Sequence, residues 1–300
     1  MDIPRDLYPF EGKHHDIDGL RLHYLDEGSG PPVLCVHGNP SWSFYYRNVV
    51  HELSSDHRVI VPDHIGCGLS DKPGDDAYEY TLERRVADLE SLVDHIGIRD
   101  GLTLIVHDWG GMIGMGLAHR RPGLVARIVA LNTGAFTLPA SKSFPWSLWL
   151  VRDTRVGAFL VQRFNAFSRG AARFCVTRRR MDPAVRQGMI APYEPRDARI
   201  ATLRFVQDIP LAPGDRAWNL VAAVEHDLPR FCDIPVLLCW GMKDFVFDHH
   251  FLDRFLELWP HAELLRLDDA GHYVLEDAPE DVVPRIRSFV DAHPLDGFHA

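Results

Sequence analysis

The chain has no long apolar run. Its first 19 residues, MDIPRDLYPFEGKHHDIDG, are charged and interrupted by proline, so they resemble neither a signal peptide nor a membrane-spanning helix. We therefore expect a cytoplasmic protein that has no membrane partner.

The chain also lacks an excess of positive charge. Its 300 residues carry a formal net charge of −10, which provides no basic surface for a nucleic-acid backbone. The one dense cationic run, Arg178-Arg179-Arg180, is flanked by mixed polar sequence, and we interpret it as the solvated face of a helix. No nucleic-acid partner is expected.

Motifs for metals and dinucleotides are missing as well. The five cysteines are odd in number, lack metal-site spacing and mostly lie among apolar residues, which predicts reduced cysteines in the core. The stretch Gly66-Cys67-Gly68 lacks the spacing of a dinucleotide-binding loop. We interpret His14-His15 and His249-His250 as surface residues. The sequence therefore predicts no cofactor and no metal site.

Short apolar runs rich in β-branched residues recur along the chain, and helical patterns lie between several of them. One such helix begins near Thr81, buries a single stripe and ends at Gly97. This alternation is typical of a mostly parallel sheet with helices on both faces, which binds ligands at the carboxyl ends of its strands. The expected strands are Leu20–Leu25, Val33–Val36, Arg58–Val61, Leu102–Val106, Ile128–Leu131, Val236–Trp240 and Glu263–Leu267.

The alternation stops after Asn132-Thr133-Gly134 and resumes at Ile234. We predict an α/β core from residues 1–134 and 231–300, with a helical cap formed by 135–230. The cap is rich in large apolar side chains, some of which we expect to line an apolar cavity. These residues are Phe144, Trp146, Leu148, Trp149, Phe159, Phe164 and Phe167.

Three polar residues lie just after predicted strands, within a few residues of each strand's end. Asp108 follows LTLIV, Asp244 follows VLLCWGMK and His272 follows ELLRLDDAG. In this chain order they match the nucleophile, acid and histidine of the α/β-hydrolase arrangement, with aspartate in place of serine. The turn at Asp108 departs from G-x-S-x-G because Val106 occupies the position of the first glycine.

The whole chain resembles the haloalkane dehalogenases of the α/β-hydrolase superfamily. HGNP and DWGG together are more specific than either alone. The matching stretches are VHGNPSWSFYYRNV (Val36–Val49), PDHIGCGLSDKP (Pro62–Pro73), VHDWGG (Val106–Gly111), GMKDFVF (Gly241–Phe247) and DDAGHYVLED (Asp268–Asp277). The resemblance implies an α/β-hydrolase fold with a mostly parallel, eight-stranded sheet flanked by helices and a helical cap.

The resemblance also implies hydrolysis of haloalkanes to an alcohol and a halide ion. Asp108, already ionised, would displace the halide and form an alkyl ester, which water activated by His272 would hydrolyse. Asp244 would orient the imidazole. The indole of Trp109 and the side-chain amide of Asn39 would bind the halide, and the backbone N–H groups of the same two residues would hold the ester oxyanion. Substrate size and oligomeric state are not readable from the sequence.

Two alternatives remain open. An epoxide hydrolase uses the same Asp-His-Asp set, but that family usually has an aromatic residue in the place of Asn39 and a pair of cap tyrosines. Between residues 135 and 230 the chain has one tyrosine, Tyr193. A related oxygenase, or a ligand-binding protein without catalysis, could use the same fold. The intact Asp108, Asp244 and His272 argue against the ligand-binding protein without catalysis.

Overall fold

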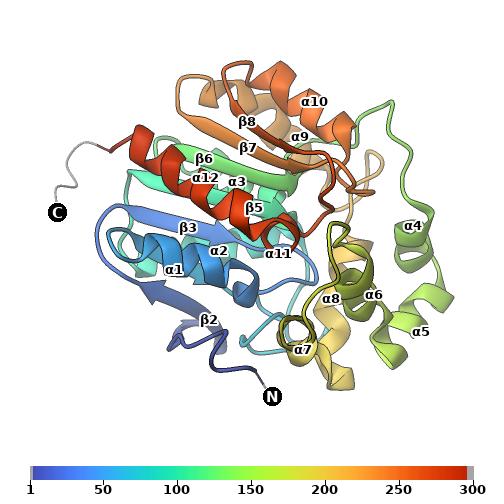
Figure 1. Ribbon diagram of the computed structural model, residues 1–300. Helices are drawn as coiled ribbons and strands as arrows, with labels where there is room; N and C mark the ends of the chain where they lie inside the picture. The colour runs from blue at the N-terminus through green and yellow to red at the C-terminus, as the bar shows by residue number, and fades with distance from the viewer. Residues whose placement is uncertain (1–2, 296–300) are drawn as a thin grey trace.

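One sheet of eight strands forms the centre of the protein (Figure 1). The computed structural model describes residues 3–295. The strands lie in the order β1-β2-β4-β3-β5-β6-β7-β8; β2 pairs antiparallel with β1 and β4, and all other pairs are parallel. The predicted fold class is therefore confirmed. The strands are β1 Lys13–Ile17, β2 Leu20–Glu27, β3 Pro32–Val36, β4 Arg58–Pro62, β5 Leu102–Asp108, β6 Val125–Thr133, β7 Val236–Gly241 and β8 Glu263–Leu267.

The first strand is the one that the sequence analysis missed. Its sequence, KHHDI, is polar, and four of its five residues are not buried because it lies at the edge of the sheet. It therefore lacks the apolar run on which strand prediction depends. The central strands β3 and β5 are buried at every residue, as expected for strands covered on both faces.

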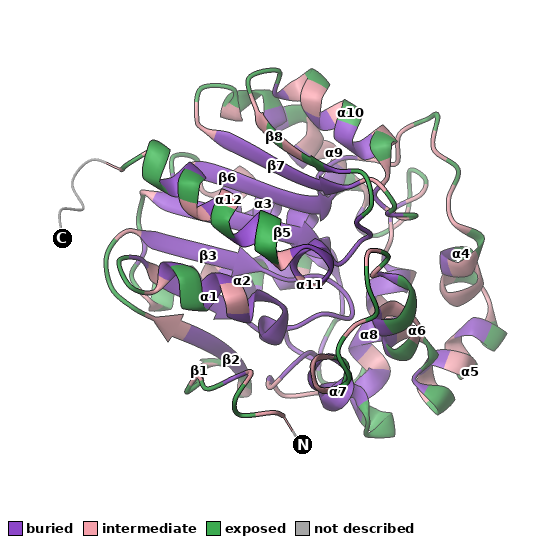
Figure 2. Cartoon of the chain, viewed as in Figure 1, coloured by how far each residue is buried: buried purple, intermediate pink, exposed green. Residues whose placement is uncertain are grey.

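Helices cover both faces of the sheet (Figures 1 and 2). On one face α1 packs against α12, and on the other α3 packs against α2 and α9. The predicted helix after Thr81 is confirmed, since the Thr81 side chain accepts a hydrogen bond from the Arg84 N–H at the start of α2. The helices around the sheet are α1 Arg47–Leu53, α2 Leu82–His95, α3 Trp109–Arg120, α9 Trp218–Asp227, α10 His249–Leu258, α11 Val274–Asp277 and α12 Pro279–Ala292.

Five helices lie between β6 and α9, at the carboxyl ends of the strands (Figure 1). They are α4 Trp146–Asp153, α5 Arg155–Phe164, α6 Ala166–Phe174, α7 Pro183–Ile190 and α8 Ile200–Gln207. The helix α9 also falls within the predicted cap, but it packs against α3 on the sheet. The division at residues 135 and 230 stays a prediction, and from here we use "cap" for α4 to α8.

One smaller expectation was wrong, and another was correct for four of five residues. The run Arg178–Arg180 lies in a loop, where Arg178 forms ion pairs with Asp269 and Asp281. Of the five cysteines, Cys232 is exposed and the other four are buried. Among residues 3–295, no helix combines the length and apolar character needed to cross a bilayer.

A sharp turn joins β5 to α3 at Asp108. This residue has φ 52° and ψ −126°, a conformation that non-glycine residues rarely adopt. The helix approaches the sheet so closely here that a Cβ on Gly110 would lie 1.9 Å from the Val36 carbonyl oxygen. The valine at position 106 fits because Gly114 faces it, and a Cβ on Gly114 would lie 2.8 Å from Val106 Cγ1.

We predict that Gly114→Ala lowers the free energy of unfolding by about 1–3 kcal/mol, because the new methyl group overlaps Val106. In a Val106→Ala background the same change should cost much less, since Cγ1 is gone and alanine favours the helix by about 1 kcal/mol. Urea unfolding of the four proteins measures this coupling. Gly170→Ala is the control, because nothing lies within 4 Å of its added Cβ. Equal costs of Gly114→Ala in both backgrounds would show that Val106 and Gly114 are not coupled.

Candidate active site

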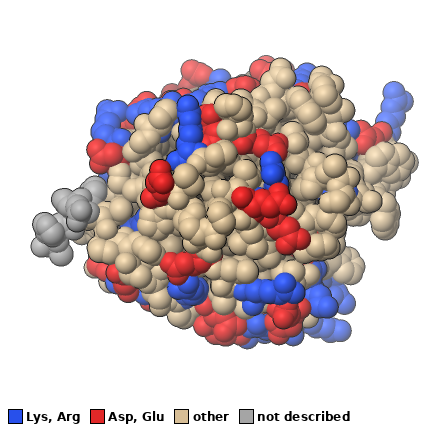
Figure 3. All heavy atoms as spheres, turned by 90° about the horizontal axis from the view of Figure 1, so that it is seen from above, with Lys and Arg blue, Asp and Glu red and all other residues tan. Residues whose placement is uncertain are grey.

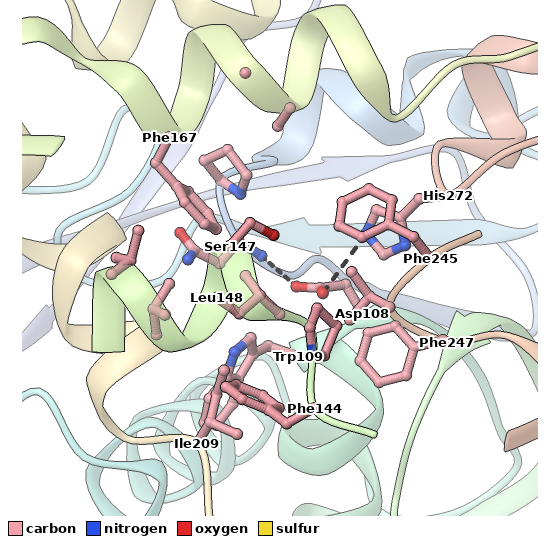
Figure 4. A pocket seen from close by; sticks show the side chains of 18 of the residues that line it. Asp108, Trp109, Phe144, Ser147, Leu148, Phe167, Ile209, Phe245, Phe247 and His272 are labelled. Carbon is pink, nitrogen blue, oxygen red and sulfur yellow. Dashed lines mark hydrogen bonds and ion pairs between the residues drawn. The ribbon is translucent and has the colours of Figure 1, made fainter. Parts of the chain in front are cut away.

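The three residues predicted from strand ends converge at the carboxyl edge of the sheet, where Figure 4 shows Asp108 and His272. Asp108 ends β5, Asp244 lies three residues after β7, and His272 lies in the loop between β8 and α11. His272 Nδ1 is 2.7 Å from Asp244 Oδ2, and His272 Nε2 is 3.6 Å from Asp108 Oδ2. All three side chains are buried. The imidazole therefore lies between the two carboxylates.

Asp108 is a buried carboxylate held by backbone donors. Its Oδ1 accepts a hydrogen bond from the Asn39 N–H at 2.6 Å. Burial raises the pKa of Asp108 above its usual value, while the charge of His272 and the backbone N–H groups of Asn39 and Trp109 lower it in part. The Thr133 hydroxyl donates to the Asp108 carbonyl at 2.5 Å and ties the turn to β6.

The Nδ1 atom of His272 carries a hydrogen and donates it to Asp244, because an ionised carboxylate can only accept a hydrogen bond. Burial by itself would lower the pKa of His272, but the charge of Asp244, the hydrogen bond to it and the charge of Asp108 outweigh burial and raise the pKa above its usual value. His107 Nε2 donates to the His272 carbonyl at 2.9 Å, which fixes the backbone next to the imidazole.

Asp244 is held in place by two donors. Its Oδ1 accepts from the Val246 N–H at 2.7 Å, and its Oδ2 accepts from Asn132 Nδ2 at 3.0 Å. Asn132 also accepts from the Gly241 N–H at 2.7 Å, so it joins the ends of β6 and β7. The sequence analysis named Asn132 only as a strand end, although its polar side chain at that position was a usable signal.

The two residues predicted to bind a halide differ in their free donors. Asn39 Nδ2 donates to the Thr202 carbonyl of α8 at 3.0 Å, and Asn39 Oδ1 is buried without a partner in the described chain. The indole N–H of Trp109 has no hydrogen-bond partner among residues 3–295, and Trp109 lines the cavity. Trp109 therefore offers an available donor next to Asp108, whereas one hydrogen of the Asn39 amide is already engaged.

Trp109 packs against a stack formed by Phe205 and Arg85. Its ring contacts Phe205 edge to face, with centroids 5.4 Å apart, and the Arg85 guanidinium lies 3.6 Å from the Phe205 centroid. Arg85 is fully buried, and its three guanidinium nitrogens have no hydrogen-bond partner in the part of the chain described. Burial raises the pKa of the neighbouring Asp208 to about 6, although Arg85 opposes this. No sequence pattern pointed to Arg85 or Phe205.

A cavity of about 600 Å³ lies over Asp108, between the sheet and the cap. Asp108 is its only carboxylate among the described residues, and its other polar side chains are few: Asn39, Trp109, Ser147 and His272. Figure 4 shows Phe144, Leu148, Phe167, Phe245 and Phe247 around them. Of the seven cap residues expected to contribute, Phe144, Trp146, Leu148 and Phe167 line the cavity, and Trp149, Phe159 and Phe164 do not.

Within the described chain, Asp248, His249 and His250 form the one cluster whose ligand atoms could meet at a metal ion. Asp248 accepts hydrogen bonds from Lys142 Nζ at 2.6 Å and from His250 Nδ1 at 2.9 Å, so its oxygens are already engaged. The cluster caps α10 and contributes no residue to the cavity. We assign it a structural role.

Comparisons with known proteins identify the family. A family model described as "alpha/beta hydrolase fold" matches residues 31–279. The chain belongs to the alpha/beta hydrolase fold family. The crystal structure of a haloalkane dehalogenase from Bradyrhizobium elkani superimposes with a TM-score of 0.83 at 26% identity, over 94% of this chain and 99% of that one.

Curated relatives divide into two groups. A cis-3-alkyl-4-alkyloxetan-2-one decarboxylase of Shewanella oneidensis is 52% identical, over 95% of this chain and 89% of the relative. A protein of the same name from Xanthomonas campestris pv. campestris is 49% identical, over 96% and 98% of the two chains. Haloalkane dehalogenase 2 of Mycobacterium tuberculosis is 34% identical, over 93% and 95%.

These identities overturn the predicted activity. The expected function, hydrolysis of carbon–halide bonds, was wrong, and so was the expected classification as a haloalkane dehalogenase. The reason is that relatives about half identical over nearly the whole chain are named decarboxylases. The motifs around Asn39, Asp108 and His272 misled the prediction because dehalogenases resemble this chain over almost its full length as well. Those motifs identify a buried carboxylate and the residues around it, and they do not specify the reaction that takes place there.

We predict that Asp244→Asn lowers the pKa of His272, because the neutral amide removes the attraction that outweighs burial. A raised pKa in the folded state stabilises the fold below the pKa of the unfolded chain, and this stability is lost as the pH rises through the folded pKa. Asp244→Asn should therefore cost more stability in mildly acidic than in alkaline solution. NMR titration of labelled histidine measures the shift directly.

The control for this titration is Asp248→Asn, which removes the carboxylate partner of His250 outside the cavity. It should leave the His272 titration unchanged, and His272→Gln identifies the resonance. An unaltered pKa of His272 in Asp244→Asn would contradict the account of this ion pair.

Proposed function

We propose that this protein removes carbon dioxide from oxetan-2-ones that carry alkyl groups on carbons 3 and 4, and releases an alkene. The observation that carries the proposal is the identity of 52% and 49%, over nearly the full chain, to proteins named cis-3-alkyl-4-alkyloxetan-2-one decarboxylases. The cavity supports it, since its lining is apolar apart from a few groups around one carboxylate. Such a lining suits a small polar ring with two alkyl chains.

In the first step, a carboxylate oxygen of Asp108 attacks ring carbon 4. A bond forms between Asp108 and carbon 4, and the bond from carbon 4 to the ring oxygen breaks. The ring opens, and its former carbonyl carbon becomes a carboxylate on the substrate. Asp108 now carries an alkyl ester. No proton is transferred, so the step needs no acid or base.

In the second step, the bond between carbon 3 and the new carboxylate breaks. Its electron pair forms the double bond between carbons 3 and 4, the bond from carbon 4 to Asp108 breaks, and that electron pair returns to Asp108. Carbon dioxide and the alkene leave. The enzyme is regenerated without water, an oxidant or a cofactor, and all atoms of the lactone are found in the two products.

This sequence of bonds preserves the geometry of the substituents. Attack at carbon 4 comes from the side opposite the ring oxygen, so the Asp108 oxygen and the carboxylate on carbon 3 are antiperiplanar. Fragmentation from this arrangement leaves the two alkyl groups on the same side. A cis-lactone therefore gives a cis-alkene.

The surrounding groups fit the charges that appear. The carboxylate released in the first step would be stabilised by the indole N–H of Trp109, which lines the cavity and has no hydrogen-bond partner among the described residues. In the second step negative charge returns to Asp108, where His272 Nε2 is 3.6 Å from Oδ2 and the Asn39 N–H donates to Oδ1. Asp244 maintains the positive character of His272. The apolar lining stabilises the substrate carboxylate poorly, which favours its loss as neutral carbon dioxide.

We predict that Asp108→Asn reduces decarboxylation of a cis-3,4-dialkyloxetan-2-one by about 10⁴-fold or more, because the amide is a poor nucleophile. Gas chromatography with mass spectrometry measures the alkene. The variant should unfold at the same temperature as the unaltered protein or higher, since it removes a buried charge whose pKa burial raises.

Two results would contradict this proposal. One is alkene formation by Asp108→Asn at the unaltered rate. The other is accumulation of the 3-hydroxy acid in place of alkene, because that product requires water and would make the protein a lactone hydrolase.

A further inference from the structure

Large apolar side chains are exposed on one part of the molecule. Of the eight such residues in the described chain, six belong to α4, α5 and α6, and each is more than half exposed, with Trp146 at 77%. Figure 2 shows exposed segments along α5, and Figure 3 shows uncharged residues together with basic and acidic ones at the end of the molecule opposite the C-terminus. We call this surface the cap outer face; its apolar residues are Trp146, Trp149, Val156, Phe159, Phe164 and Phe174.

The same face is cationic. In α5 and α6, between Arg155 and Phe174, the chain has four arginines and no aspartate or glutamate, although the whole chain has a net charge of −10. On α4, Arg152 is paired with Asp153 and Asp215. The four arginines of α5 and α6 are exposed, and none forms an ion pair with another described residue. Two of them lie over neighbouring rings, Arg163 over Phe164 at 5.5 Å and Arg173 over Phe174 at 5.4 Å. The arginines are Arg155, Arg163, Arg169 and Arg173.

The pKa of a neighbouring arginine, Arg199, is affected by this positive charge. The pKa of Arg199 lies below its usual value, chiefly because of burial, with Arg169 and Arg163 among the charges that lower it further. Elsewhere on the molecule arginines are commonly paired; Arg287, for example, binds Asp56 and Asp291. The cap outer face thus combines exposed aromatic rings with positive charges that have no protein counter-ion.

The cavity reaches the surface beside this face. Trp146, Phe174 and Phe245 line the cavity, and each is at least 44% exposed. Two of the three belong to the cap outer face. A molecule that enters or leaves the cavity past Trp146 or Phe174 therefore crosses the surface that carries the aromatic rings and the unpaired arginines.

We propose that the cap outer face binds the surface of an anionic lipid bilayer, from which apolar molecules enter the cavity. This proposal replaces the expectation of no membrane partner, which rested on the lack of a spanning helix; binding to a bilayer surface needs none. Aromatic residues that enter the headgroup region, with arginines that pair with lipid phosphates, are typical of interfacial helices. The unpaired arginines favour this occupant, because a bilayer containing anionic lipid supplies counter-charges across the whole face. The supply route rests on the proposed function, since a dialkyl lactone and its alkene dissolve in a bilayer; the binding itself does not.

Vesicle flotation tests the proposal with the full-length protein. We expect binding to vesicles of phosphatidylcholine mixed with phosphatidylglycerol, much weaker binding to phosphatidylcholine alone, and release as salt screens the arginines. Trp149→Ser and Phe159→Ser, which do not line the cavity, should each weaken binding by about tenfold. Arg163→Gln combined with Arg169→Gln should abolish the preference for anionic lipid.

Matched controls lie far from the cap outer face. Leu264→Ser replaces an exposed apolar residue of β8, and Arg99→Gln replaces an exposed arginine that pairs with Asp94. Neither should change flotation. The assay requires no turnover, so binding without decarboxylation would overturn the proposed function alone, and decarboxylation without binding would overturn this inference alone.

Three outcomes would overturn the inference. The first is equal binding, or none, to neutral and anionic vesicles. The second is unchanged binding by the aromatic and arginine variants. The third is a dimer, measured by light scattering, that these same variants dissociate while vesicle binding is absent, which would make the cap outer face an interface between two copies of the chain.

Discussion

The buried charge of Asp108 is the constraint on which the rest of this site depends. An ionised carboxylate in an apolar cavity is costly unless donors compensate for the lost water. Here the compensation comes from the N–H of Asn39, from the N–H of Trp109 and from His272. Each donor comes from a different segment of the chain. At the turn marked by the positive φ of Asp108 and the close approach at Gly110, the N–H groups of Asn39 and Trp109 donate hydrogen bonds to the carboxylate, and His272 Nε2 lies 3.6 Å from it.

In the proposed mechanism, the substrate determines what happens to the alkyl ester of Asp108. An alkyl ester formed from a haloalkane has no bond that fragments easily, so it persists until water attacks. An ester formed from an oxetan-2-one carries a carboxylate on the adjacent carbon, and loss of carbon dioxide expels Asp108 directly. In the proposed mechanism the Asp108, His272 and Asp244 set does not by itself determine the reaction, and the cavity selects the molecule that meets it.

The sequence could predict the position of Asp108 and its partners, but not the substrate. Apolar runs and a turn of unusual composition identified the sheet, Asp108 and its two partners, because buried strands and strand-end polar residues leave strong local patterns. The pattern failed for β1, whose polar residues lie at the sheet edge. It also failed for the stack of Arg85 and Phe205 under Trp109, because two separate helices meet there without a motif. Most of the cap aromatics were recognised, although Phe174 was not. Which of them line the cavity, which lie on the cap outer face and which, like Trp146, do both depends on tertiary packing.

The fate of the Asp108 ester is the central claim, and one turnover in oxygen-18 water tests it directly. Fragmentation breaks the bond between Asp108 and the substrate carbon, so both carboxylate oxygens of Asp108 remain those of the protein. We predict that the peptide containing Asp108 shows no added label by mass spectrometry, while one alkene forms per active site. Incorporation of one labelled oxygen into Asp108 during that turnover would mean that water attacks the ester carbonyl, and would contradict the mechanism.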